Sequence, residues 1–198
     1  MPAPRKHREA ILASAVKLFR RQGYAATGIA EILSESGAPK GSLYHYFPGG
    51  KSEIGAEAVT VAGAKVAGTL DELATRVTDP GELVAQYLTL MAGWMAQSGF
   101  RDGCPITTTL LETVPQHEAI HVAGRAAFGS WVETIARVAH DSGIAPDRAA
   151  TLARFSISAL EGALIQCRVS GDESPLVEAA VELRALFEAA RAGRSGFV

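Results

Sequence analysis

Hydrophobic positions recur at helical spacing from the beginning of the chain. A predicted helix over residues 5–22 has an apolar face made of Ile11, Leu12, Ala15, Leu18 and Phe19. Gly23 follows as a residue that can end a helix by adopting positive φ. The same spacing predicts later helices over about 51–77, 82–98, 105–113, 116–142, 147–169 and 175–191.

Two shorter helices are predicted in between, over about residues 28–36 and 39–47. We expect Thr27 to cap the former, Gly37 to make the turn, and Pro39 to be the first residue of the latter. Neither strand-like alternation nor an internal repeat interrupts the pattern. The sequence therefore predicts an all-α protein of about nine helices.

Two short helices joined by a tight glycine turn are the helix-turn-helix arrangement, whose second helix enters the DNA major groove. Ile29, Ile32 and Leu33 give the first helix an inner face, and Leu43 with Phe47 anchors the second. The residues left around the outer face and start of the second helix are Pro39, Lys40, Gly41, Ser42, Tyr44, His45 and Tyr46. Such cationic, hydroxyl and ring groups suit phosphates and base edges. The alternative is that Tyr44 and Tyr46 pack against neighbouring helices.

Charge is distributed unevenly along the chain, although the formal net charge is only −2. Residues 1–51 carry eight basic side chains against three acidic ones, a net of +5, and the remainder carries −7. The basic residues are Arg5, Lys6, Arg8, Lys17, Arg20, Arg21, Lys40 and Lys51. A basic N-terminal part on an acidic body indicates that only the former meets a polyanion.

Cysteine usage and hydropathy indicate the compartment. Cys104 and Cys167 are too few for a disulfide framework, so we expect a reducing cytoplasm. The first twenty residues interleave charges and contain no apolar signal-peptide core. The longest uncharged stretch, residues 83–100, is interrupted by polar residues and glycines and is expected to be a buried helix, with no membrane span.

A family resemblance covers the helix-turn-helix region. The segment "GYAATGIAEILSESGAPKGSLYHYFPGGK", residues 23–51, resembles the DNA-binding signature of the TetR family of bacterial transcriptional regulators. Gly103-Cys104-Pro105 and the additional glycine before Lys51 resemble the LmrA/YxaF-type branch. The resemblance implies a DNA-binding domain over residues 1–52 and a helical ligand-binding and dimerisation domain over 53–198.

The resemblance also assigns roles within that segment. It implies that Thr27 contacts phosphate from the start of the second helix, and that Tyr46 and Lys51 grip the DNA backbone. The residues that it places in the groove are Lys40, Gly41, Ser42, Tyr44 and His45. Gly28 and Ala30 depart from the residues usual at the start of the second helix in this family.

A zinc-peptidase pattern competes with this interpretation. His117, Glu118 and His121 form H-E-x-x-H, in which the histidines would bind zinc and the glutamate would act as general base. A catalytic zinc needs a third protein ligand, and the position that would supply it in the longer form of the motif is Ala127. The alternative is an ordinary polar first turn of a helix. We expect no metal, no cofactor and no enzyme activity.

The C-terminal part carries groups that suit a small apolar ligand with a few polar contacts. The predicted ligand-binding residues are Tyr87, Met91, Trp94, Met95, Phe100, Cys104, Thr107, Thr108, Leu111, Phe128, Trp131, Glu161 and Gln166. The alternative is that most of them are core residues of a helical bundle. Cys104, at a predicted helix start, is either a redox or electrophile sensor or a small buried cysteine.

The last two long helices carry apolar stripes that suit a homodimer interface. The stripes consist of Leu152, Phe155, Ala159 and Ala163, and of Leu176, Ala180, Leu183 and Phe187 flanked by Val177 and Val181. The resemblance implies a four-helix bundle between two subunits. The alternative is that both stripes close the core of one subunit. A two-fold dimer would bind a near-palindromic operator.

These observations predict a ligand-responsive repressor. A small hydrophobic molecule would favour a conformer in which the long fourth helix, over about residues 51–77, tilts and releases the operator. The competing hypotheses are the zinc metallopeptidase and a helical adaptor that does not bind DNA.

Overall fold

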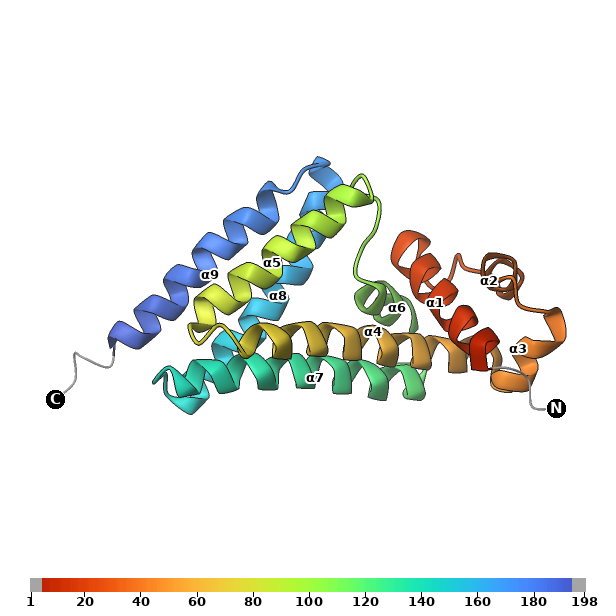
Figure 1. Cartoon of the computed structure of the whole chain (residues 1–198), viewed down its shortest axis with the longest axis horizontal. Helices are drawn as coiled ribbons and strands as arrows, with labels where there is room; N and C mark the ends of the chain where they lie inside the picture. The colour runs from red at the N-terminus through yellow and green to blue at the C-terminus, as the bar shows by residue number, and fades with distance from the viewer. Residues whose placement is uncertain (1–4, 194–198) are drawn as a thin grey trace. The chain divides into compact units, whose positions relative to one another are not determined.

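The structure is a computed structural model that describes the backbone of residues 5–193 and the side chains of residues 7–193. The basic side chains of Arg5 and Lys6 therefore lie outside the described residues. Within that range the chain forms nine α-helices and no strand, as predicted (Figure 1). The helices are α1 (Arg5–Gln22), α2 (Ile29–Ser36), α3 (Lys40–Tyr46), α4 (Gly50–Ala74), α5 (Pro80–Gln97), α6 (Pro105–Thr113), α7 (Glu118–Asp141), α8 (Pro146–Ser170) and α9 (Ser174–Ala192). None of the described helices is long and apolar enough to cross a membrane.

The helices divide into two compact units. The N-terminal unit consists of residues 5–64 and 103–127, and the C-terminal unit consists of residues 65–102 and 128–193. The N-terminal unit thus extends beyond the predicted boundary at residue 52, because it includes α6 and the first turns of α7.

The core of the N-terminal unit is built from the predicted apolar faces. The side chains of α1 that were expected to face inward, Ile11, Leu12, Ala15, Leu18 and Phe19, are all buried. Ile32 of α2, Leu43 of α3 and Ile54 of α4 are fully buried as well. Helix α1 packs against α2, α3 and α6, so burial of its apolar face stabilises the whole unit.

Two predicted helix starts are wrong by one residue. Thr27 does not cap α2: the N-cap is Gly28, which has no side chain to offer, and the Thr27 hydroxyl donates instead to the Gly23 carbonyl oxygen at 2.7 Å. Pro39 is the N-cap of α3, which begins at Lys40. The predicted turn is confirmed, because Gly37 ends α2 in the left-handed region at φ 63°.

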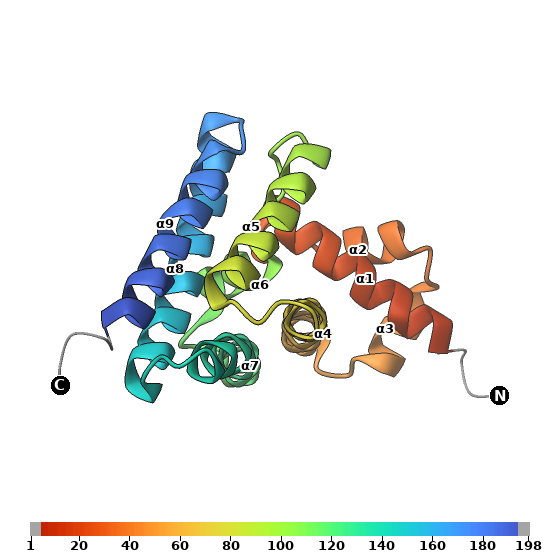
Figure 2. The ribbon, with the colours of Figure 1, turned by 60° about the vertical axis from the view of Figure 1, so that its left-hand side comes forward.

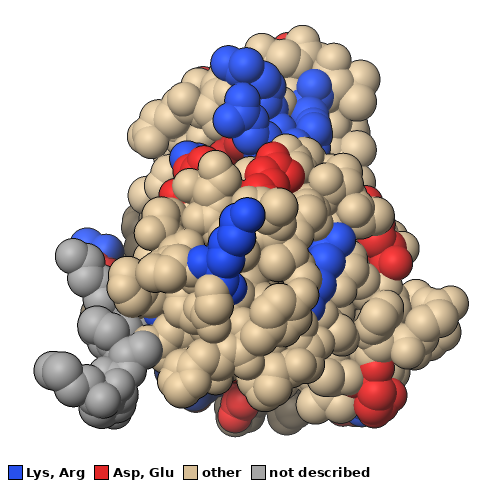
Figure 3. Space-filling view, turned by 90° about the vertical axis from the view of Figure 1, so that its right-hand side faces the viewer, with Lys and Arg blue, Asp and Glu red and all other residues tan. Residues whose placement is uncertain are grey.

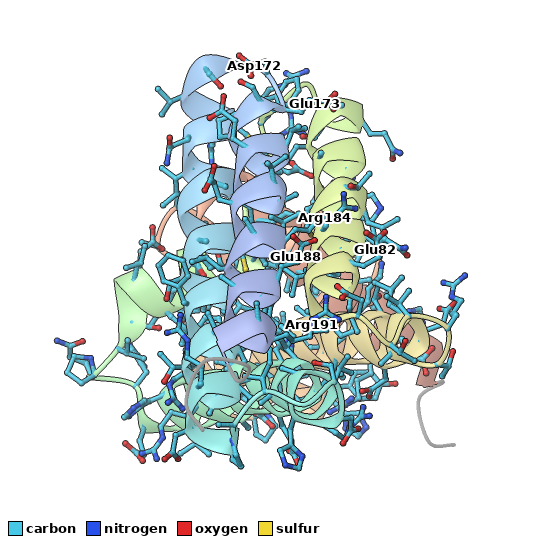
Figure 4. The ribbon with its side chains drawn as sticks, turned by 90° about the vertical axis from the view of Figure 1, so that its left-hand side faces the viewer. Glu82, Asp172, Glu173, Arg184, Glu188 and Arg191 are labelled. Carbon is cyan, nitrogen blue, oxygen red and sulfur yellow. The ribbon has the colours of Figure 1, made fainter. Side chains whose placement is uncertain are left out.

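In the C-terminal unit, α9 packs along α5 and α8 (Figure 2). A Cβ atom at Gly81 would lie only 3.0 Å from the Arg184 Cα atom, so glycine permits the close approach of α5 and α9. Two ion pairs join the same helices: Arg184 with Glu82 at 2.5 Å, and Arg191 with Asp79 at 2.7 Å. Figure 4 shows Arg184 and Glu82 pointing toward one another between α9 and α5.

Candidate nucleic-acid interface

Helix α3 has one buried side and one outward side. Leu43 and the adjoining Phe47 are fully buried, which fixes the rotation of the helix on its unit. Tyr44 is 61% exposed, and Lys40 and His45 are exposed beside it. An exposed phenol, imidazole and ammonium on one short helix can donate hydrogen bonds to a partner that the helix itself does not provide.

The other predicted residues of α3 are placed less openly. Gly41 and Pro39 are exposed, whereas Ser42 is half-buried and its hydroxyl donates to the Pro39 carbonyl oxygen at 2.5 Å. Tyr46 is half-buried, and its ring meets that of His45 edge-on with 5.1 Å between the centroids. Packing therefore occupies Tyr46 in part, while Tyr44 points outward.

Thr27 and Lys51, predicted to contact phosphate, have side chains engaged inside the unit. Thr27 is fully buried, and a phosphate contact through its hydroxyl would require the hydrogen bond to Gly23 to break. Lys51 Nζ donates to the Ala25 carbonyl oxygen at 3.3 Å and lies 4.3 Å from the centroid of the Tyr24 ring. Burial lowers the pKa of Lys51, and the nearby Glu112 carboxylate partly offsets this by raising it.

The N-terminal unit is less basic than its first 51 residues. Beyond them it adds Arg125 and four acids, Glu53, Glu57, Glu112 and Glu118, so the net charge falls from +5 to +2. Ion pairs tie Arg8 to Glu57 and Lys17 to Glu35. On the face that Figure 3 shows, several basic side chains lie together next to acidic ones, and the other basic side chains stand apart on a largely uncharged surface.

One residue at this site could not be found from the sequence. Glu112, on α6, accepts a hydrogen bond from the Ala25 backbone N–H at 2.6 Å, in the turn between α1 and α2. The two residues are 87 positions apart in the chain. No local spacing or motif in the sequence relates them.

The zinc-peptidase motif does not form a metal centre in the described part of the chain, where no three His, Cys, Asp or Glu side chains are grouped to hold an ion. His117 precedes α7 and its Nδ1 lies 3.3 Å from the Ser52 hydroxyl. His121 lies 3.7 Å from Glu118. The arrangement agrees with a polar helix start.

The predicted ligand-binding residues are divided between the two units. In the C-terminal unit, Tyr87, Met91, Met95 and Trp131 are buried, Phe100, Phe128 and Glu161 are half-buried, and Trp94 and Gln166 are exposed. A hollow of about 380 Å³ in this unit is lined by other residues, including Asp79, Arg137 and Arg191.

The remaining predicted ligand-binding residues belong to the N-terminal unit. Cys104 is the half-buried N-cap of α6, and Leu111 is 75% exposed. The Thr108 hydroxyl donates to the Phe19 carbonyl oxygen at 3.0 Å, whereas the buried Thr107 hydroxyl oxygen has no hydrogen-bond partner among the described residues.

The apolar stripes of helices α8 and α9 contain both buried and exposed residues. Leu152, Ala163, Leu176, Leu183 and Phe187 are buried within the C-terminal unit, and Ala159 and Ala180 are half-buried. A second set is exposed: Phe155 by 51%, Ile165 by 57%, Val169 by 84%, Val177 by 51% and Val181 by 59%. The exposed residues of each helix recur at helical spacing and form one face.

A helix pair joined by a left-handed glycine, with the second helix presenting Lys40, Tyr44 and His45 outward, defines a helix-turn-helix DNA-binding protein. Residues 11–58 match the family described as bacterial regulatory proteins, tetR family, and residues 80–182 match the C-terminal domain of LmrA/YxaF-like transcriptional regulators. The chain belongs to the TetR family, in its LmrA/YxaF-like branch, and is a DNA-binding transcriptional regulator.

Relatives match over most of the chain. The transcriptional regulator YxaF of Bacillus subtilis is 35% identical over 179 residues, which cover 90% of this chain and 94% of YxaF. LmrA of the same organism is 30% identical over 170 residues, covering 86% and 90%. The crystal structure of regulatory protein TetR from Rhodobacter sphaeroides has the same fold, with a TM-score of 0.81 at 21% identity over 90% of this chain and 97% of that one.

Proposed function

We propose that the protein is a ligand-responsive repressor that binds a near-palindromic operator as a homodimer. The observation that carries the DNA contact is the outward side of α3, where Tyr44 is 61% exposed while Leu43 and Phe47 are fully buried beneath it. Lys40, Gly41, Ser42 and His45 would complete the contact with groove and phosphates.

The homodimer would form through the exposed apolar face of α8 and α9. Phe155, Ile165 and Val169 on α8, with Val177 and Val181 on α9, expose hydrocarbon that a second copy would cover. A two-fold dimer would bring two α3 helices to successive major grooves, about 34–36 Å apart, which is why we expect a near-palindromic operator.

The effector would be a small hydrophobic molecule bound in the C-terminal unit. Support comes from Tyr87, Met91 and Met95, which recur at helical spacing on α5 and are buried, and from the buried Trp131 of α7. Release of the operator requires only that the effector prefer one of two conformers. A hundredfold loss of operator affinity corresponds to about 2.7 kcal/mol of coupling.

The DNA contact is tested by selecting bound duplexes from random sequence with the full-length protein. We expect a near-palindromic consensus, bound specifically by the wild type and not by Lys40→Ala/Tyr44→Ala, with helicity and dimer mass unchanged. The control is Arg76→Ala, an exposed basic residue just after α4. Specific binding by the double variant would refute the assignment of α3.

The effector is tested by titrating the fluorescence of Trp94 and Trp131 with a panel of hydrophobic compounds. A compound that releases the selected duplex should change the fluorescence with saturation at the same concentrations. A releasing compound that leaves both tryptophans unperturbed would place the effector elsewhere.

A further inference from the structure

The segment from Gly103 to Glu112 contacts the end of α1. The Gly103 backbone N–H donates to the Arg20 carbonyl oxygen at 2.8 Å, and the Thr108 hydroxyl lies between two acceptors, the Phe19 carbonyl oxygen at 3.0 Å and the Cys104 carbonyl oxygen at 2.9 Å. The last carbonyls of a helix have no partner within the helix. Here a segment distant in sequence provides a hydrogen bond to the Arg20 carbonyl oxygen, and the Phe19 carbonyl oxygen also accepts from the Gly23 N–H at 2.9 Å. The start of α6 therefore contacts the end of α1.

The same segment holds the turn between α1 and α2. Glu112 Oε2 accepts from the Ala25 N–H at 2.6 Å, a charge-assisted hydrogen bond. A Cβ atom at Gly23 would lie 2.6 Å from Glu112 Oε1, and Gly23 has φ +88°. Glycine at this position therefore permits both the backbone conformation and the close approach of the carboxylate.

Lys51 approaches the same residue from α4. Its Nζ donates to the Ala25 carbonyl oxygen at 3.3 Å and lies over the ring of the buried Tyr24. The N–H and C=O groups of Ala25 are thus held by opposite charges from two other helices. The Thr27 N–H donates to the Tyr24 carbonyl oxygen at 3.1 Å and closes the turn.

We propose that Glu112 and Lys51 are positioning residues for operator binding, which clamp the backbone of Ala25 and thereby set where α2 begins relative to α1. This inference rests on the proposed role of α3, because α2 and the Gly37 turn carry α3. It gives Lys51 an internal task in place of the phosphate contact that the family resemblance implies. Through Glu112, helix α6 would also contribute to operator binding.

The decisive measurement is the affinity of the full-length protein for its selected duplex between about 50 and 300 mM potassium chloride. Lys51→Met is expected to weaken binding about tenfold with an unchanged slope of log K against log salt. Lys40→Met, the contrast, should reduce the slope by about 0.9 for each phosphate that the protein no longer neutralises. A comparable fall in slope for Lys51→Met would overturn the proposal.

Glu112 is tested by a graded pair of substitutions. Glu112→Ala should weaken operator binding about tenfold, whereas Glu112→Gln, whose amide oxygen can still accept from Ala25, should recover at least threefold of that loss. The control is Glu118→Ala, since Glu118 is exposed on α7 and is expected to leave affinity unchanged. Wild-type affinity in Glu112→Ala, or no recovery in Glu112→Gln, would contradict the clamp.

Hydrogen exchange of the Ala25 amide separates this inference from the proposed function, because it needs no DNA. Exchange at Ala25 should accelerate at least tenfold in Glu112→Ala and in Lys51→Met, while the amides of α5 exchange as in the wild type. If no duplex is bound specifically but exchange at Ala25 accelerates in the variants, the proposed function is wrong, while Glu112 and Lys51 do hold the backbone of Ala25. Unchanged exchange at Ala25 in both variants would show that Glu112 and Lys51 do not hold its backbone.

Discussion

Helix α3 and the α8–α9 pair both expose large side chains, but of different chemistry. On α3 the exposed groups are a phenol, an imidazole and an ammonium, from Tyr44, His45 and Lys40. On α8 and α9 they are hydrocarbon, with Val169 exposed by 84% and Val181 by 59%. The first surface offers hydrogen bonds and positive charge to a polar partner, and the second offers only apolar area.

The two surfaces suit different partners, and operator binding is expected to depend on both surfaces. The partner that we propose for the surface of α3 is DNA, and the one that we propose for the surface of α8 and α9 is a second copy of the chain. Because one α3 helix reads only a half-site, the affinity for a whole operator depends on the apolar face as well as on the polar one. Substitutions on the apolar face should therefore have the larger effect on operator binding.

The largest effect is expected from Val169→Glu/Val181→Glu. Two carboxylates placed in an apolar interface must lose their hydration on association, so the dimer should dissociate. Operator affinity should then fall by at least about a hundredfold, since the second half-site no longer binds within the same complex. Light scattering gives the mass, and fluorescence anisotropy gives the affinity.

The matched control for this double variant is Val122→Glu, which places a carboxylate on an exposed valine of α7. It should remain dimeric and bind the operator as the wild type does. A dimer that persists in Val169→Glu/Val181→Glu would show that the apolar face of α8 and α9 is not the interface.

A smaller effect is expected on α3, where Tyr44 and Tyr46 form a natural pair. Tyr44→Ala should weaken operator binding about tenfold to a hundredfold, the range expected when one specific base interaction is removed, without changing the midpoint of thermal unfolding. Tyr46→Ala should lower that midpoint, because its half-buried ring packs against His45. If Tyr44→Ala unfolds earlier and Tyr46→Ala does not, the outward and packed roles have been assigned the wrong way round.

The sequence predicted the α3 surface better than the α8–α9 surface, and the reason is geometric. In α3 a short local pattern, Leu43 and Phe47 between polar residues, defines which side is buried. In α8 the buried Leu152 and the exposed Phe155 lie on adjacent parts of one wide apolar arc. Periodicity locates such an arc but not the line within it between the core of one subunit and a surface for another.

Contacts distant in sequence escaped prediction for a different reason. The hydrogen bond from Ala25 to Glu112 joins residues 87 positions apart, so no window along the chain contains both. The charge balance of the first 51 positions likewise omitted Glu57, which pairs with Arg8. The all-α class, the nine helices and the turn at Gly37 depend on local pattern, and these were predicted.

The contacts that hold α9 on α5 should affect neither partner surface. Asp79 is the N-cap of α5: its carboxylate accepts from the Glu82 N–H at 2.8 Å and pairs with Arg191 at 2.7 Å. Asp79→Ala should lower the free energy of unfolding by about 1–2 kcal/mol, mainly through removal of the cap. Chemical denaturation measures this, and dimer mass and operator affinity serve as readouts that should not change.

The smallest effect is expected at Arg184, which pairs with Glu82 at 2.5 Å. Both side chains keep a large part of their surface in water, 48% and 39% respectively, so solvent screens the attraction. Arg184→Ala should therefore cost only about 0.2–1 kcal/mol of unfolding free energy. Arg184 follows Val181 by three residues, so it lies where the exposed apolar face of α9 gives way to charge. A loss of dimer mass in Arg184→Ala, with stability nearly unchanged, would mean that the interface extends past the valines onto the charged part of the helix.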